Sequence, residues 1–165
     1  MPISSHCRCR TALASILLLA TCAAFASGPT DMKGAETANG KVAVAWVDLN
    51  FNQHKPAEAF DRYVHQDYRN KYMGGPRVID NNDFEGQKAA EIRVFGGPQA
   101  AGLSFTFRKV IASEDFVFVQ GMAKRGTEAT GNMLWMLFRF KDGRIIEHWD
   151  MHAGLPENSD PELYF

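Results

Sequence analysis

The chain has 165 residues and a formal net charge of −1 at pH 7, and 45% of its residues are hydrophobic and 12% aromatic. This charge balance excludes the strongly basic surface of a nucleic-acid-binding domain. The length suits one domain with one core, and the many aromatic residues indicate a substantial apolar interior or pocket.

Residues 1–26 have the pattern of a secretory signal peptide. Arg8 and Arg10 precede the apolar run ALASILLLATCAAFA, and an A-x-A motif at residues 24–26 provides small residues at the cleavage positions. The run is shorter than the roughly 20 apolar residues of a membrane span. We therefore expect export to the periplasm or the cell exterior, with the mature chain beginning near Ser27.

The three cysteines, Cys7, Cys9 and Cys22, all lie in this leader. A chain cleaved after residue 26 therefore has no disulfide, no cysteine nucleophile and no thiolate metal site. The stretch LATC also resembles a bacterial lipobox, but Thr21 stands where Gly, Ala or Ser is usual. Soluble export is therefore favoured over lipid anchoring through Cys22.

Residues 27–41 are small, polar and rich in glycine, and they predict a flexible lead-in to a domain over residues 42–165. From Val42 to Leu49 apolar residues recur at helical spacing, and Asn52 can end this first helix. Pro56 suits the first turn of a second helix, over residues 56–64.

A long connection with turn-forming residues follows, and Asp83 can cap a third helix that ends near Phe95. The hydrophobic period then changes to two. It predicts four strands over residues 103–112, 115–125, 132–140 and 144–152, and the KDG sequence at 141–143 is a tight-hairpin signal. Helices followed by a strand meander indicate an α+β domain whose helices cover one face of a curved sheet.

The last strand carries a polar stripe. Alternate residues of a strand share a face, so Ile146, His148, Asp150 and His152 are expected on one face. The preceding strand is apolar on both faces, which predicts that the stripe is at least partly enclosed. The outer two histidines are about 13 Å apart at a rise of about 3.3 Å per residue, too far for both to bind one ion. We therefore expect no metal.

Three segments resemble a known family. FRFKDGRIIEHWDMH is similar to the terminal hairpin of SnoaL-like polyketide cyclases, in the nuclear-transport-factor-2-like superfamily. FNQHKPAEAFDRYV resembles the opening helices of that family, and SEDFVFVQGMAKR resembles its central strand. The resemblance implies a cone-shaped α+β barrel, with N-terminal helices packed on a strongly curved, mainly antiparallel sheet around a pocket. It also implies a homodimer formed through the outer face of the sheet.

The resemblance implies catalysis without cofactor or metal. Asp150 would be the general acid/base of an intramolecular aldol closure, and His148 would support it. The expected substrate-binding residues are Tyr68, Asn70, Tyr72, Gln120 and Trp135. Gln120 can instead pair within the sheet, and Trp135 can be a core or dimer contact.

Two classes of function remain open. The first is an exported, cofactor-free cyclase or isomerase in which Asp150 removes a proton next to a carbonyl of a small molecule. The same chemistry can activate water, as in the epoxide hydrolases of the superfamily. The alternative is a non-catalytic module that binds a hydrophobic small molecule or a protein, in which Asp150 is a structural residue bonded to Tyr68, Asn70 or a backbone amide.

Overall fold

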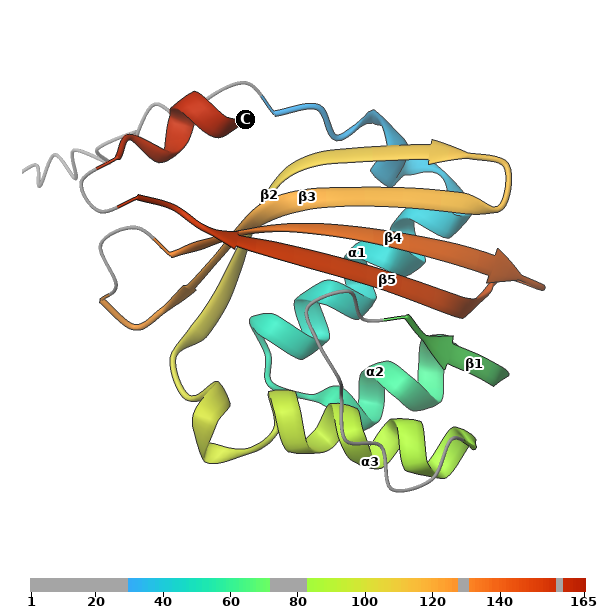
Figure 1. The fold of residues 1–165 in the computed structure, drawn as a ribbon. Helices are drawn as coiled ribbons and strands as arrows, with labels where there is room; N and C mark the ends of the chain where they lie inside the picture. The colour runs from blue at the N-terminus through green and yellow to red at the C-terminus, as the bar shows by residue number, and fades with distance from the viewer. Residues whose placement is uncertain (1–29, 72–82, 128–130, 157–158) are drawn as a thin grey trace, which may run out of the picture.

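The computed structural model describes residues 30–71, 83–127, 131–156 and 159–165 (Figure 1). The helices are α1 (Ala38–Phe51), α2 (Pro56–Tyr63) and α3 (Phe84–Phe95), with short 3₁₀ segments η1 (Lys33–Glu36), η2 (Pro98–Ala100) and η3 (Pro161–Tyr164). The strands are β1 (Val64–Asn70), β2 (Leu103–Ser113), β3 (Phe116–Arg125), β4 (Asn132–Lys141) and β5 (Arg144–Gly154). The expected signal peptide and Tyr72 lie outside the described residues. Within those residues, no helix is long and apolar enough to cross a membrane.

One sheet organises the fold. Its strand order is β1-β5-β4-β3-β2, with β1 parallel to β5 and the other neighbouring pairs antiparallel. The helices lie on one side of the sheet, and α1 passes behind the strands in the view of Figure 1. The predicted α+β class is therefore confirmed, although the sheet remains open and does not close into a barrel.

All three helices begin at residues that favour a helix start. Thr37 Oγ1 accepts a hydrogen bond from Gly40 N at 3.0 Å, and Pro56 is the first residue of α2. Asp83 Oδ1 accepts from Gly86 N at 2.9 Å, which confirms the predicted cap of α3. Each cap satisfies a backbone donor that has no partner inside its helix.

Asp31 and the short segment η1 lie along the edge of β2. Asp31 N donates to Arg108 O at 3.0 Å, and Val110 N donates to Asp31 O at 2.7 Å. Gly34 is packed so closely on the strand that an added Cβ would lie 2.6 Å from Val110 O. A covered edge strand is protected from pairing with another chain.

A second part of the same edge is covered by one side chain. Asn52, directly after α1, accepts a hydrogen bond from Phe105 N at 2.8 Å and donates to Phe105 O at 3.3 Å. The side-chain amide thus satisfies both backbone groups of a strand residue. This pairing fixes the end of α1 to the beginning of β2.

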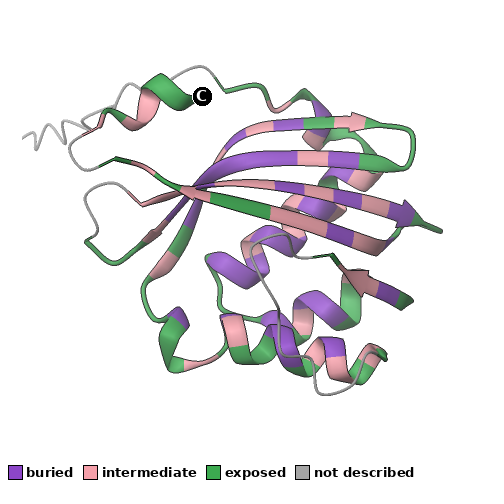
Figure 2. Cartoon of the chain, in the orientation of Figure 1, coloured by how far each residue is buried: buried purple, intermediate pink, exposed green. Residues whose placement is uncertain are grey.

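The core fills the space between the helices and the concave face of the sheet, where buried residues gather on both layers (Figure 2). Aromatic side chains dominate its contacts. Trp46 of α1 packs edge-on against Phe138 of β4, with ring centroids 5.4 Å apart. Phe51 packs against Phe95 of α3 at 4.7 Å and against Phe105 of β2 at 5.4 Å. These contacts hold α1 across the sheet.

A bulge in β5 changes one predicted side-chain direction. Arg139 pairs with Glu147, but the next residue, Phe140, pairs with Ile145, so Ile146 is an extra residue. The bulge places Ile145 on the face of His148, where it is completely buried. The expected alternation, which put Ile146 on that face, is therefore wrong at this position.

The short strand β1 has no clear signal in the sequence. Only Val64 and Tyr68 are buried in it, and the residues between them are partly or fully exposed. Its partner β5 lies some 80 residues further along the chain, and Lys71 N continues the pairing by donating to His148 O at 2.7 Å. The strand is therefore created by long-range pairing rather than by its own pattern.

The packing of β3 on β2 requires a glycine at position 121. An added Cβ would lie 2.3 Å from Phe105 Cζ and 2.4 Å from Thr106 O. We predict that Gly121→Ala lowers the free energy of unfolding by about 1–3 kcal/mol, because an overfilled core forces the strands apart. Urea denaturation measures this change.

Gly154→Ala is the matched control, because a Cβ there would make only an ordinary contact, 3.5 Å from Asn132 Oδ1. It should change stability by less than about 0.5 kcal/mol. Equal stability of the two variants would contradict the packing described for Gly121.

Candidate functional site

The polar stripe of β5 runs from the core to the rim of the concave face. His148, Asp150 and His152 pair across the strands with Phe138, Met136 and Leu134 of β4, respectively. Burial decreases along the stripe: His148 is 2% exposed, Asp150 is intermediate and His152 is exposed. The three side chains therefore occupy three different depths in the fold.

His148 lies in an aromatic enclosure at the deep end of the stripe. Its ring stacks on Phe138, with centroids 4.6 Å apart and planes within 5°, and Trp46 approaches edge-on at 5.0 Å. Tyr68 Oη lies 3.5 Å from His148 Nδ1. His148 lines neither of two cavities described below, one beside Asp150 and one beside Arg144. Its contacts are with the packed core.

The predicted pair Tyr68 and Asn70 lies beside His148, because Asn70 is its register partner in β1. Asn70 Nδ2 donates to Glu91 Oε1 at 3.0 Å, and Glu91 is 1% exposed. Glu91 is a buried carboxylate that the sequence analysis did not identify. Its position in the sequence offers one indication of burial. Glu91 lies four residues after Gln87, so the two side chains share one face of α3, where both are buried.

A cavity of about 280 Å³ lies at the rim, where β2 begins, beside the ends of α1 and α3. It contains the outer part of the polar stripe. Its apolar lining comes from both layers: Phe51, Val94, Phe95, Leu103, Ala123, Leu134 and Met151. Its polar lining is Arg125, Asn132, Asp150 and His152. An apolar cavity with a few convergent polar groups is the usual form of a small-molecule site. We call it the rim cavity.

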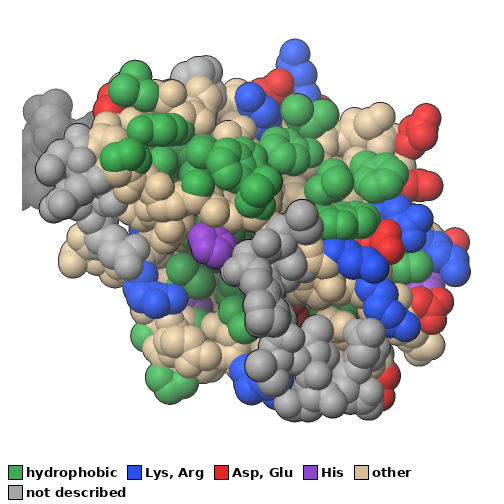
Figure 3. Space-filling view, in the orientation of Figure 1, with side chains coloured by type: hydrophobic (Ala, Val, Ile, Leu, Met, Phe, Trp, Pro, Cys, Tyr) green, Lys and Arg blue, Asp and Glu red, His purple; other side chains and the backbone are tan. Residues whose placement is uncertain are grey.

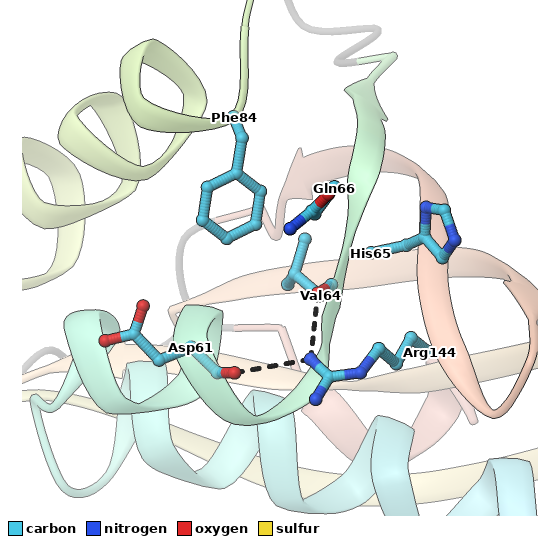
Figure 4. A pocket seen from close by; sticks show the side chains of 6 residues that line it. All are labelled: Asp61, Val64, His65, Gln66, Phe84 and Arg144. Atoms are coloured by element: carbon cyan, nitrogen blue, oxygen red, sulfur yellow. Dashed lines mark hydrogen bonds between the residues drawn. The ribbon is translucent and has the colours of Figure 1, made fainter.

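A larger hollow, of about 480 Å³, lies at the opposite end of the sheet (Figure 4). It is lined by α2, β1, the first residue of α3 and Arg144. Arg144 Nη1 donates to Asp61 O at 3.3 Å and Val64 O at 3.2 Å, which ties the start of β5 to the end of α2. None of the predicted site residues that the structure describes lines this hollow. The rim cavity, which contains Asp150, is therefore the better candidate site although its volume is smaller.

Gln120 and Trp135 lie on the outer face of the sheet, where they pair with each other across β3 and β4. Gln120 Nε2 donates to Tyr164 O at 3.5 Å, in the C-terminal segment. Trp135 lines a hollow of about 210 Å³ with Phe118, Leu137, Trp149, Asp150 and Met151. Asp150 and Met151 therefore border both this hollow and the rim cavity. Gln120 and Trp135 do not line the rim cavity.

The described residues contain no group of three histidine, cysteine or acidic side chains that could hold a metal ion. Of the predicted set, the structure brings Tyr68, Asn70 and His148 together away from the rim cavity, with Tyr68 and His148 buried and Asn70 partly buried. It places Asp150 in the wall of the rim cavity. His152 was expected on the face of Asp150 but without a role in the site, and Arg125 was not expected there. Both line the cavity. A polar residue two positions after Asp150 on the same face was the available signal for His152.

Comparison with known proteins identifies a family. The model of the SnoaL-like domain matches residues 43–148, a range that ends just before Asp150. A search of curated proteins finds no match.

Several solved structures share the fold. A candidate polyketide cyclase from Acidithiobacillus ferrooxidans is 17% identical, with a TM-score of 0.56 over 72% of this chain and 89% of that one. An epoxide hydrolase of the LEH-like type from M. tuberculosis is 15% identical, with a TM-score of 0.55 over 70% of this chain and 83% of that one. A protein of the NTF2-like type from Cytophaga hutchinsonii is 9% identical, with a TM-score of 0.52 over 71% of this chain and 90% of that one.

The close packing around His148 predicts that removing its side chain destabilises the fold. We expect His148→Ala to lower the free energy of unfolding by about 2–4 kcal/mol, because it leaves a void between Phe138 and Trp46. The exposed His54 provides the control: His54→Asn, which tolerates the positive φ of 54° there, should change stability by less than about 0.5 kcal/mol. A loss below about 1 kcal/mol for His148→Ala would contradict this role.

Proposed function

The chain belongs to the family of SnoaL-like domains, and we propose that it binds a small, largely apolar carbonyl compound in the rim cavity and moves a proton on it. The observation that supports this proposal best is the position of Asp150, a carboxylate in the wall of an otherwise mainly apolar cavity. The pattern of residues 1–26 supports export of the mature protein before it acts.

Asp150 is the proposed general base. A positioned carboxylate can remove a proton from the carbon next to a carbonyl group. The electron pair of the broken C–H bond then forms the double bond of an enolate, and the negative charge moves to the oxygen. In a β,γ-unsaturated compound, return of the proton from Asp150 to the γ-carbon of the conjugated enolate gives an isomer. In a compound with a second carbonyl, attack of the enolate carbon on that carbonyl closes a ring, and the resulting alkoxide takes the proton from Asp150. Asp150 also interacts with another group of the chain, which can orient the carboxylate.

His152 is the proposed partner for the developing oxyanion. It lies two residues after Asp150 on the same face, at a separation of roughly 6.6 Å along the strand. A carbonyl group bound between the two side chains can present its α-proton to Asp150 and its oxygen to His152. Stabilisation of charge where it develops is a large contribution to catalysis of this kind.

The buried residues His148 and Tyr68 are proposed to position this site rather than to contact the substrate. His148 precedes Asp150 by two residues on β5 and is held on Phe138 and Trp46. Its packing fixes the backbone from which Asp150 extends. Neither His148 nor Tyr68 lines the rim cavity, so a role in the chemistry itself is not part of the proposal.

Non-catalytic binding is the second candidate. It is supported by the positions of Tyr68 and Asn70, two expected substrate-binding residues that do not line the cavity: Tyr68 is buried, and Asn70 donates to Glu91. A binding module needs the apolar cavity but not the proton transfer. The two candidates therefore differ in one measurable property, the exchange of a ligand's α-protons.

The test uses 2-tetralone, an apolar ketone with acidic α-protons, incubated with the protein in D₂O and followed by NMR. We expect the protein to accelerate the exchange of these protons for deuterium. Asp150→Asn should reduce the acceleration by about 100-fold or more, because an amide cannot act as the base. The matched control is Asp115→Asn, the same substitution in an exposed turn, which should leave the rate unchanged.

Undiminished exchange in Asp150→Asn would contradict the assigned base. Binding of 2-tetralone without any acceleration by the unaltered protein would contradict catalysis of this type and would favour the binding module.

We also propose that the protein is a homodimer formed through the outer face of the sheet. Hydrophobic side chains gather over the strands on this face (Figure 3), and the hollow there is lined by Phe118, Trp135, Leu137, Trp149 and Met151, with Asp150 as its sole charged lining residue. Met151, at its edge, is 53% exposed. Pairing with a second copy about a two-fold axis would bury this surface on both subunits at once.

Sedimentation velocity tests this association. The protein should sediment as a dimer, and Trp149→Glu should convert it to a monomer, because a charge would be buried in the interface. Ile92→Glu, a matched change at a residue on α3 that is 38% exposed, should remain dimeric. A monomeric unaltered protein, or a dimeric Trp149→Glu variant, would contradict the proposed interface.

A further inference from the structure

The rim cavity has a charged entrance that the proposed function does not use. Arg125 lies at the end of β3 and Asn132 at the beginning of β4, and both line the cavity. Arg125 is exposed and Asn132 is partly buried, whereas the apolar lining residues Phe51 and Phe95 are buried. The cavity thus has a basic, hydrogen-bonding entrance and an apolar middle.

We propose that the rim cavity selects a small anionic substrate, an apolar compound with a carboxylate that Arg125 binds at the entrance. The inference rests on the proposed function, because it names the class of molecule on which Asp150 acts. It makes Arg125 a specificity-determining residue and assigns it no part in the proton transfer.

The register of the sheet separates the two charged ends of the cavity. Asn132 pairs with Gly154 at the entrance, and Asp150 pairs with Met136, four residues further along β4. Four residues correspond to roughly 13 Å of strand. A ligand with a carboxylate at one end and a reactive carbon at the other can therefore contact Arg125 without bringing its negative charge against Asp150.

The charges of the lining residues favour one orientation of such a ligand. Asp150 is the sole acidic residue among those that line the cavity, and Arg125 provides a permanent positive charge. Asp150 repels the carboxylate of a ligand from the inner end of the cavity, and Arg125 attracts it to the entrance. The ligand then enters with its apolar part first, which brings the reactive carbon to Asp150 and His152.

Arg125 can bind a ligand without giving up its existing interactions. The side chain already interacts with another group of the chain. A guanidinium has five N–H donors in a planar fork that matches the two oxygens of a carboxylate, so one partner does not exhaust it. Because Arg125 is exposed, a ligand can reach it without unfolding of the rim.

The size of the cavity limits the ligand. A volume of about 280 Å³ is close to the lower end of the range for small-molecule sites, about 300–1,000 Å³. It suits a molecule with a single ring or a short chain. Phe51, Phe95 and Leu134 give its middle part an aromatic and aliphatic wall.

The test compares two probes of the same shape, 3-phenylpropanoate and its primary amide, by calorimetric titration of the protein. They differ in charge but not in the number of heavy atoms. We expect the carboxylate to bind at least about 10-fold more tightly than the amide, with a preference that shrinks as salt concentration rises. Arg125→Gln should remove the preference by weakening the carboxylate alone. Arg125→Lys should keep part of it, because the charge remains but the fork is lost.

Arg62→Gln is the matched control, since Arg62 is an exposed arginine on α2 that pairs with Glu58 and does not line the cavity. It should leave both affinities unchanged. Equal binding of the two probes, or an equal loss of both in Arg125→Gln, would overturn the inference while leaving the cavity and Asp150 in place. Failure of both probes to bind would overturn it together with the cavity as the ligand site. A carboxylate preference without any α-proton exchange would support the selectivity and contradict the catalysis.

Discussion

The stacking of His148 on Phe138 is the contact on which the rest of the site depends. It sets the register of β5 on β4 at the point where α1 crosses the sheet, and Trp46 closes the enclosure from the helix side. Once His148 is paired with Phe138, the alternation of side chains along β5 places Asp150 and then His152 on the same face, each closer to the rim. Asp150 reaches the wall of the rim cavity, and His152 reaches its exposed border. One polar stripe therefore supplies a core residue and two cavity residues.

The sequence was sufficient for the elements that carry their own signals. Asp83 and Pro56 marked helix starts through local capping and backbone geometry, and the KDG turn marked the last hairpin, where Asp142 and Gly143 have positive φ. The resemblance to SnoaL-like domains supplied the arrangement of these elements. Asp31, η1 and β1 carry no such local signal, because contact with strands far away in the chain determines their positions.

The site was harder to predict than the fold, because the residues that line a cavity are brought together by contacts between segments far apart in the chain. A strand pattern tells which residues share a face, but it does not tell where the cavity ends along that face. Tyr68, Asn70 and His148 lie together, but beside the buried Glu91 and not at the rim cavity. Arg125 reaches the cavity because of where β3 ends, and the extra residue Ile146 redirected a side chain that alternation had placed elsewhere. Gln120 and Trp135 lie on the opposite face, which is the face proposed for dimer formation.

Ligands are proposed to bind at the rim cavity beside Asp150 and not in the larger hollow beside Arg144. Backbone amide shifts recorded by NMR while 2-tetralone is added test this proposal most directly. The account predicts that the largest shifts fall on Leu103, Leu134 and Asp150, around the rim cavity. Shifts centred on Val64, Phe84 and Arg144 would place the ligand in the other hollow and would contradict the account.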